Sequence, residues 1–153
     1  MPIIKLEGHG YIDKIVTLGL ENDLEVQATL TKICHDVKPI MEKYNWHIKK
    51  IKEFIPKERH KLKGKLYRSN KKSRVVMLLQ LRKPKSLELD NYAHLLKIFL
   101  HELAHLKVVE HSTDFYQFLQ QITDEFETDQ QTLDQKKLFL IRSRKLRGRT
   151  VPF

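Results

Sequence analysis

The feature that most constrains this chain is the segment His101-Glu102-Leu103-Ala104-His105, which is followed by His111. Positions i and i+4 of a helix lie on one face with Cβ atoms about 5–6 Å apart, so both imidazoles can bind one metal ion. Glu102 projects one step further around the helix, where its carboxylate can reach a water on that ion without binding the ion itself. The spacing therefore predicts His101 and His105 as zinc ligands and Glu102 as a catalytic base, the arrangement of a zinc metalloendopeptidase.

A catalytic zinc needs a third protein ligand and an open fourth position. His111 follows His105 by six residues, so a continuous helix would place it about 240° away, and the helix must end within residues 106–110. That segment has no glycine to ease the turn. Glu125, on the next expected helix, is the alternative, because thermolysin-like gluzincins take a glutamate from a following helix. We expect one zinc ion per chain, held by His111 as third ligand in preference to Glu125.

Apolar residues recur at helical spacing in three parts of the chain. Residues 92–106 form the stripe beside the histidines, and Asp90 or Asn91 can cap that helix. Residues 22–43 predict a second helix, which Pro39 should kink or end early. A third helix is expected from Ser112 or Thr113 to about residue 126, followed by a polar stretch and a basic tail over residues 142–153.

Short apolar and β-branched runs predict a small sheet. Residues 46–54 and 75–81 are expected strands, and Leu66 with Tyr67 can form a short one between them. Residues 1–20 are weakly patterned and fit either a flexible arm or a strand. The length favours one domain over residues 1–153, and the layout is α+β, with a small mixed sheet, the metal helix and two further main helices.

The chain is strongly basic, with 29 Lys and Arg against 19 Asp and Glu and a formal charge of +10. Such a charge attracts polyanions without reading sequence. The basic residues gather in two regions, residues 57–74 and the C-terminal tail. Aromatic residues that could stack on unpaired bases are sparse in both, so we expect charge-driven contact with DNA, either single-stranded or sequence-independent. The candidate DNA-binding residues are Arg142, Arg144, Lys145, Arg147, Arg149, Lys71 and Lys72. The alternative for the C-terminal group is a solvated tail.

The single cysteine and the lack of long apolar stretches indicate the cellular compartment and argue against a membrane or secreted protein. Cys34 is the single cysteine, so no internal disulfide can form, which favours the reducing environment of nucleus or cytoplasm. No stretch approaches the roughly 18 apolar residues of a membrane helix, and the N-terminal residues lack the pattern of a secretory signal. We therefore expect no membrane partner.

The chain resembles the WLM-domain metallopeptidases, which include the fungal DNA–protein crosslink proteases, over roughly residues 25–150. The segments that carry the resemblance are Phe54-Ile55-Pro56, Leu62-Lys63-Gly64, Leu79-Gln80-Leu81-Arg82, the metal motif with His111, and Leu146-Arg147-Gly148-Arg149. The departures are Val108-Val109-Glu110 where a glycine is common, Ser112 where an acidic residue is expected, and Arg147 where a second glycine is common.

The resemblance implies a zincin-like fold and a zinc-dependent endopeptidase that degrades proteins bound or crosslinked to DNA. It also implies stimulation by DNA, self-cleavage, a nuclear location with the cytoplasm as alternative, and partners from the ubiquitin or SUMO pathways. Two alternatives stay open: a general zinc peptidase indifferent to DNA, and a non-catalytic nucleic-acid-binding module with a structural zinc site. The glutamate of the motif argues against the second, because a structural site needs no base.

Substrates of such peptidases commonly pair with a strand beside the metal helix. Residues 75–81 are the candidate strand, with a buried central position for Val76, Leu78 and Leu81 as the favoured alternative. The group that stabilises the oxyanion is left open among Tyr11, Tyr67, Tyr116 and an arginine of the tail.

Overall fold

The computed structural model describes residues 1–56, 62–68 and 74–147, with side chains as far as residue 133. Its elements follow one another in the order β1 (Ile3–Lys5), β2 (Ile12–Val16), α1 (Asp23–Asp36), α2 (Lys38–Tyr44), β3 (Ile48–Glu53), β4 (Gly64–Arg68), β5 (Val75–Leu79), α3 (Tyr92–Ala104) and α4 (Thr113–Arg147). The expected α+β layout is confirmed.

The strands form one mixed sheet in the order β1-β2-β3-β5-β4. β2, β3 and β5 run parallel, and the edge strands β1 and β4 pair antiparallel with their neighbours. Residues 1–20 therefore hold two strands, which is the second of the two alternatives, and not a flexible arm. The physical reason is burial, because Ile12 and Ile15 are 1% and 0% exposed and anchor β2 beside β3.

The strand that borders the metal helix differs from the one expected. β5 lies inside the sheet between β3 and β4, so residues 75–81 offer no free edge. Val76 and Leu81 are buried and Leu78 is half-buried, as the favoured alternative predicted. The free edge belongs to β4, which precedes β5 in the chain but lies outside it in the sheet.

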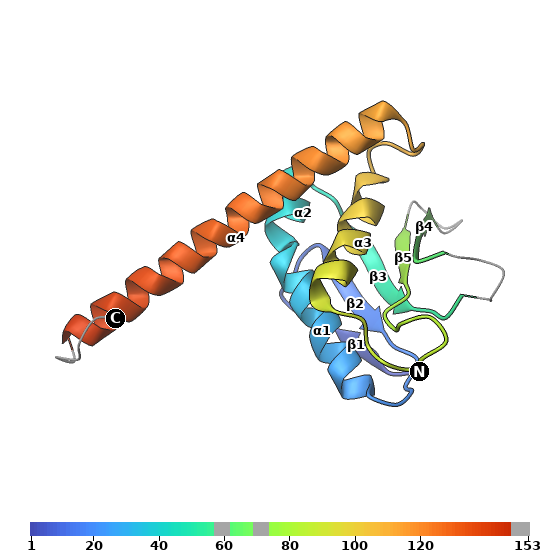
Figure 1. Ribbon diagram of the computed structural model, residues 1–153, viewed down its shortest axis with the longest axis horizontal. Helices are drawn as coiled ribbons and strands as arrows, with labels where there is room; N and C mark the ends of the chain where they lie inside the picture. The colour runs from blue at the N-terminus through green and yellow to red at the C-terminus, as the bar shows by residue number, and fades with distance from the viewer. Residues whose placement is uncertain (57–61, 69–73, 148–153) are drawn as a thin grey trace.

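Helices cover one face of the sheet, with α1 against β2 and α3 against β4 and β5 (Figure 1). The predicted helix over residues 22–43 ends at Asp36, and a second helix resumes at Lys38, with Pro39 in its first turn. Proline is tolerated there because the first N–H groups of a helix have no partner within it. Pro39 thus ends the first helix early, as predicted.

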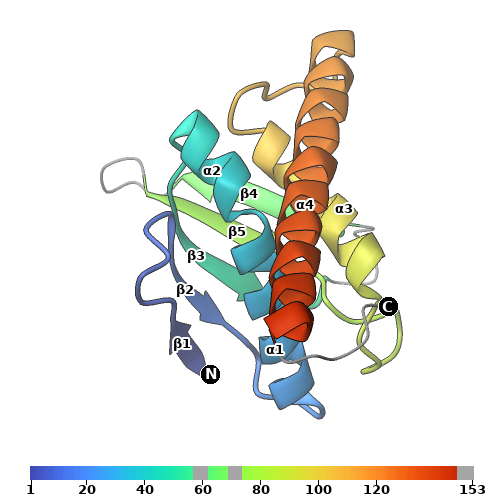
Figure 2. The same ribbon diagram turned by 90° about the vertical axis from the view of Figure 1, so that its left-hand side faces the viewer.

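α4 is a single helix of 35 residues rather than one that ends near residue 126. No glycine or proline interrupts residues 113–147, so nothing in the polar stretch stops the helix. Its first part packs on α2 and α3, and its second part projects away from the body (Figures 1 and 2). The basic segment from residue 142 therefore begins within a helix. No helix among the described residues is long and apolar enough to cross a membrane.

Candidate metal centre

α3 carries the HExxH segment and is anchored at both its start and its inner face. The Asn91 side chain accepts a hydrogen bond from the His94 backbone N–H at 2.8 Å, which caps the helix. Leu95, Phe99 and Leu103 are at most 1% exposed and fix the helix against the core. This burial sets the rotation of α3, so that the other side of the helix presents the motif to a cleft beside β4.

The structure brings the three histidines together at the C-terminal end of α3. His111 Nε2 lies 3.1 Å from Nε2 of His101 and 3.1 Å from Nε2 of His105. One ligand nitrogen from each residue falls within 4.8 Å of the others. Glu125 does not join them, because its carboxylate accepts a hydrogen bond from Tyr44 at 2.9 Å on the side of α4 that faces α2.

The chain makes the turn from His105 to His111 without a glycine. The helical bonding pattern loosens after Ala104, whose carbonyl accepts from the N–H groups of both Lys107 and Val108. Among the described residues outside glycine, positive φ angles occur only at Asn22, Asn45 and Lys85, none of them in this turn. The departure at residues 108–110 from the pattern of the resemblance is thus accommodated without any positive φ angle.

The three nitrogens fit a metal ion better than they fit hydrogen bonds to one another. His105 Nδ1 lies 3.1 Å from the Val108 carbonyl, which holds the proton on Nδ1 and leaves a lone pair on Nε2. Burial, with His105 and His111 nearby, lowers the pKa of His101, which favours the neutral imidazole that a metal ion requires. Tetrahedral zinc with bonds of about 2.0–2.1 Å sets its ligand nitrogens about 3.3 Å apart. The cluster can therefore hold a metal ion.

Glu102 lies beside the histidines and is 7% exposed. Burial raises the pKa of its carboxyl to about 7, because water no longer stabilises the charged form. A carboxyl with this affinity for protons can exchange one near neutral pH. The position and environment of Glu102 therefore suit a general base.

The cleft in front of Glu102 has a volume of about 800 Å³ and is walled by β4 on one side and α3 on the other. Gln80 N–H donates to the Lys63 carbonyl at 2.8 Å, so Lys63 and Gln80 are a hydrogen-bonded pair of the antiparallel ladder between β4 and β5. Bonded and non-bonded pairs alternate along an antiparallel ladder. Gly64, Leu66 and Arg68 therefore direct their backbone N–H and C=O groups away from β5, along the cleft.

A family model for the WLM domain matches residues 11–152. The chain belongs to the WLM domain family. The resemblance to the metallopeptidases that include the DNA–protein crosslink repair proteases is thereby confirmed.

Two solved structures share the fold of this WLM domain. Wss1 from Saccharomyces cerevisiae is 23% identical, with a TM-score of 0.65 over 85% of this chain and 94% of that one. Wss1 from S. pombe is 22% identical, with a TM-score of 0.62 over 77% of this chain and 93% of that one. Both support the zincin-like class expected from the sequence. No curated protein matches the chain in sequence.

Phe115 of α4 is a part of the WLM-domain site that sequence reasoning missed. It is fully buried, and its ring centroid lies 4.3 Å from that of His105 and 4.9 Å from that of His101. The His111 ring lies 5.2 Å away on another side. Phe115 thus forms an apolar base under all three imidazoles, whereas the sequence marked it only as one apolar residue of the last helix.

Gly64 is a second contributor whose role becomes visible only in three dimensions. A Cβ atom at this position would lie 3.0 Å from Cγ of Glu102 and 3.1 Å from Cγ2 of Ile98. The signal in the sequence was the glycine itself, in the segment Leu62-Lys63-Gly64 that carries part of the family resemblance. The contact explains it, because β4 can approach α3 this closely only without a side chain.

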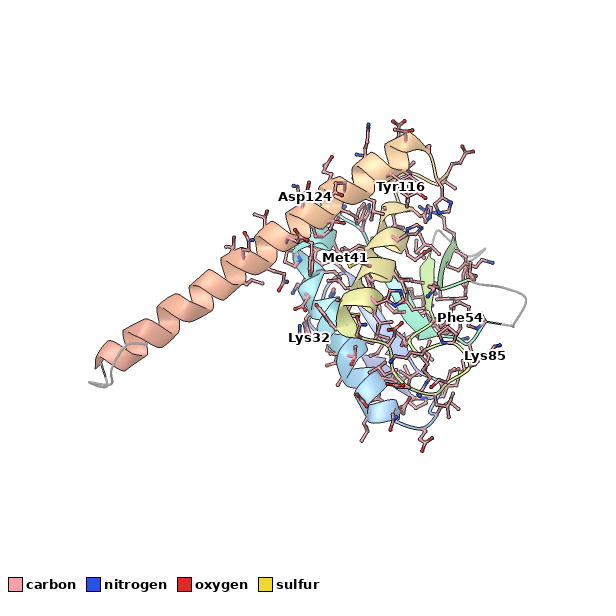
Figure 3. The ribbon with its side chains drawn as sticks, in the orientation of Figure 1. Lys32, Met41, Phe54, Lys85, Tyr116 and Asp124 are labelled. Atoms are coloured by element: carbon pink, nitrogen blue, oxygen red, sulfur yellow. The ribbon has the colours of Figure 1, made fainter. Side chains whose placement is uncertain are left out.

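The residues considered for oxyanion stabilisation and for DNA binding lie in separate parts of the structure. Tyr67 lies on β4 at the border of the cleft, and Tyr116 lies at the start of α4 with its ring centroid 6.3 Å from that of His111 (Figure 3). Tyr11 lies next to His9 just before β2 and is not among the residues that line the cleft. Lys71, Lys72 and Arg149 lie outside the described residues. Arg142, Arg144, Lys145 and Arg147 lie in the projecting end of α4, where only the backbone is described.

Proposed function

We propose that this WLM domain is a zinc-dependent endopeptidase that degrades proteins bound or crosslinked to DNA. One observation carries the peptidase part: three imidazole nitrogens converge beside a buried glutamate, in a cleft bordered by a free strand edge. His101, His105 and His111 are the proposed ligands of one zinc ion, and Glu102 is the proposed catalytic base. These three histidines would hold the ion at the cleft, where water and substrate could reach it.

The chemistry divides between the ion and the protein. When bound, zinc lowers the pKa of a water molecule and polarises the carbonyl under attack. Glu102 accepts the proton of the attacking water and then delivers it to the leaving amine. Its burial keeps bulk water from competing for that proton, and the His105 contact with Val108 holds an imidazole in the right tautomer.

The substrate chain is proposed to extend along β4. Gly64, Leu66 and Arg68 offer the unpaired N–H and C=O groups with which an extended peptide pairs. Main-chain pairing places a scissile carbonyl near the metal centre without requiring a particular side chain. Such binding suits an enzyme that must accept many different proteins.

The DNA part rests on two supports, the +10 charge and membership of a family that includes DNA–protein crosslink repair proteases. We infer DNA-stimulated activity, self-cleavage and a nuclear location on that basis. Single-stranded or sequence-independent DNA and DNA-bound proteins are the proposed partners. Ubiquitin- or SUMO-pathway partners are expected from the family resemblance alone.

Stimulation by DNA is the first test. Cleavage of a basic DNA-binding protein should rise on addition of a single-stranded oligonucleotide, and the stimulation should disappear as salt increases, because phosphate contacts weaken with ionic strength. Initial rates with and without the oligonucleotide across a salt series measure the effect. Equal rates under all conditions would favour the general zinc peptidase. A fourth protein ligand in a zinc-edge diffraction map would favour the structural zinc site.

Substitution of Gly64 tests the close approach of β4 to α3. Gly64→Ala should lower kcat by about tenfold and Gly64→Val by about 100-fold, because the added atoms displace the Glu102 side chain from its position. Zinc content should stay near one per chain in both variants, since neither reaches the histidines. Full activity of Gly64→Val would show that the position of Glu102 tolerates the displacement.

A further inference from the structure

The sheet has a second face, opposite α1 and α3, whose side chains follow from the register of the strands. Gly64 faces α3, so its neighbours Lys65 and Tyr67 point to the other face. Directly opposed residues of adjacent strands share a face, which extends this face across β5 and β3 to β2 and β1. Val16 and Val76 lie on it, and both are buried without belonging to the hydrophobic core beneath the helices.

Lysines fill this open face of the sheet in two adjoining rows. The first row runs Lys5, Lys14, Lys50, Val76 and Tyr67 across all five strands. The second row runs Ile3, Val16, Lys52, Leu78 and Lys65. Five of these ten side chains are lysines and none is acidic. Neighbouring strands are about 4.8 Å apart and alternate residues along a strand about 6.7 Å apart, so the charges form a dense array.

Within the part of the chain that the structure describes, the array has no acidic partner at ion-pair distance. Among the ion pairs of the described residues, none involves Lys5, Lys14, Lys50, Lys52 or Lys65. Arg74 lowers the pKa of the neighbouring Lys49 most, followed by desolvation and then by Lys14 and Lys50, so positive charge is concentrated around the start of β3. Lysine stems can cover apolar surface while their ammonium groups reach water, which accounts for the burial of Val16 and Val76 on this face.

A face of this kind selects its partner by charge. A second copy of the chain is disfavoured, because a two-fold contact would place five lysines against five others. Tyr67 stands at the end of the first row and is 38% exposed. An aromatic ring beside a line of cations is the combination that binds unpaired nucleic-acid strands, with the ring stacking on a base and the cations on phosphates.

We propose that the open face of the sheet, formed by Lys5, Lys14, Lys50, Lys52, Lys65 and Tyr67, binds a single-stranded nucleic acid. This proposal rests on the proposed function and gives it a location. It places the nucleic acid on the sheet, rather than on the earlier candidates Lys71 and Lys72 and the basic tail over residues 142–153.

The position of β4 relates the two sites. The side chains of Lys65 and Tyr67 belong to the open face of the sheet, while the free backbone edge of β4 borders the cleft that contains Glu102. A protein held on a strand of DNA at the open face is thereby brought next to the edge where its backbone would pair. The geometry favours cleavage of proteins attached to that strand over cleavage of free ones.

The test measures binding of the full chain to a fluorescent oligothymidine over a range of salt. Five phosphate contacts predict a log–log slope of about −3.5 from this face alone. The double variant Lys50→Gln/Lys52→Gln should reduce the slope by about 1.4 and weaken binding about 20-fold at 0.1 M salt. The matched control Lys32→Gln/Lys83→Gln removes the same charge from α1 and from the loop after β5, and its slope should stay that of the wild type (Figure 3 shows Lys32 on α1).

A second pair of variants tests the stacking residue. Tyr67→Leu should weaken binding about tenfold with an unchanged salt slope, and Tyr67→Phe should restore it, because phenylalanine keeps the ring.

If Lys50→Gln/Lys52→Gln does not fold, Lys5→Gln/Lys65→Gln on the two edge strands replaces it, with the same expected slope.

Equal losses in the sheet variant and the control would overturn the proposal, because net charge alone would then explain binding. An unchanged slope in the sheet variant would overturn it as well. Tighter binding of poly-glutamate or of anionic lipid vesicles than of the oligonucleotide would assign the face to another partner. Binding is read without cleavage, so failure of the proposed peptidase activity would be seen separately, as no cleavage by the wild type with or without DNA.

Discussion

Glu102→Gln should reduce the rate of protein cleavage by about 10²- to 10⁴-fold and leave the zinc content near one ion per chain. The amide has nearly the same size as the carboxyl, so it fits the same buried position beside the histidines. It cannot accept a proton from the attacking water. Binding and metal capture thus persist while the proton transfer is lost.

The measurement compares kcat/KM on a DNA-binding protein, self-cleavage and zinc content in wild type and variant. Glu110→Gln is the matched control, because that glutamate is exposed, lies in the turn just before His111 and has no described side-chain hydrogen bond. Its activity should stay within about twofold of the wild type. Cleavage by Glu102→Gln at the wild-type rate would contradict the mechanism, whatever the effect of DNA.

Local patterns in the sequence were sufficient to predict the metal helix. The apolar stripe of residues 92–106 set the face of α3 that packs on the core, and the i, i+4 spacing placed His101 and His105 together on one face beside it. Asn91 capped the helix as expected, because an N-cap depends only on the residues next to it. Such short-range features can be predicted without knowing the rest of the fold.

Contacts between distant segments could not be predicted in this way. The order of the strands in the sheet is not their order in the chain, so the free edge fell to β4 instead of residues 75–81. The approach of Gly64 to Glu102 and the packing of Phe115 under the histidines depend on that arrangement. Residues 1–20 became strands through burial against β3, a tertiary effect that weak local patterning does not reveal.

The third ligand shows where local reasoning reached its limit. The helical period showed that His111 cannot face the same ion as His105 if the helix continues. The chain therefore had to turn before His111, although residues 107–110 contain no glycine to favour a turn. The structure makes the turn by loosening the helix at Ala104, which costs little because the freed N–H groups still find carbonyl partners. The lack of a glycine in this turn is therefore a weak argument against His111 as third ligand. The spacing of the three histidines is the stronger argument, and it favours His111.

His111→Ala and Glu125→Ala should separate the two rivals for that third position. His111→Ala should lower zinc affinity more than about 100-fold, since loss of a direct ligand exceeds the effect of losing its supporting hydrogen bonds. Cleavage should disappear with the metal. Zinc content after dialysis against a weak chelator, with activity measured on the same samples, reports both quantities.

Glu125→Ala should keep zinc and activity but lose stability. The Glu125 carboxylate accepts hydrogen bonds from Tyr44 at 2.9 Å and pairs with Lys43 at 3.1 Å, which ties α4 to α2. Removing a charged acceptor of this kind costs about 1–3 kcal/mol of unfolding free energy, measured by urea titration. Loss of zinc in Glu125→Ala with zinc retained in His111→Ala would instead assign the ligand to α4, and α4 would then have to rotate away from Tyr44. The 3.1 Å convergence of His111 on the other two histidines requires no such movement.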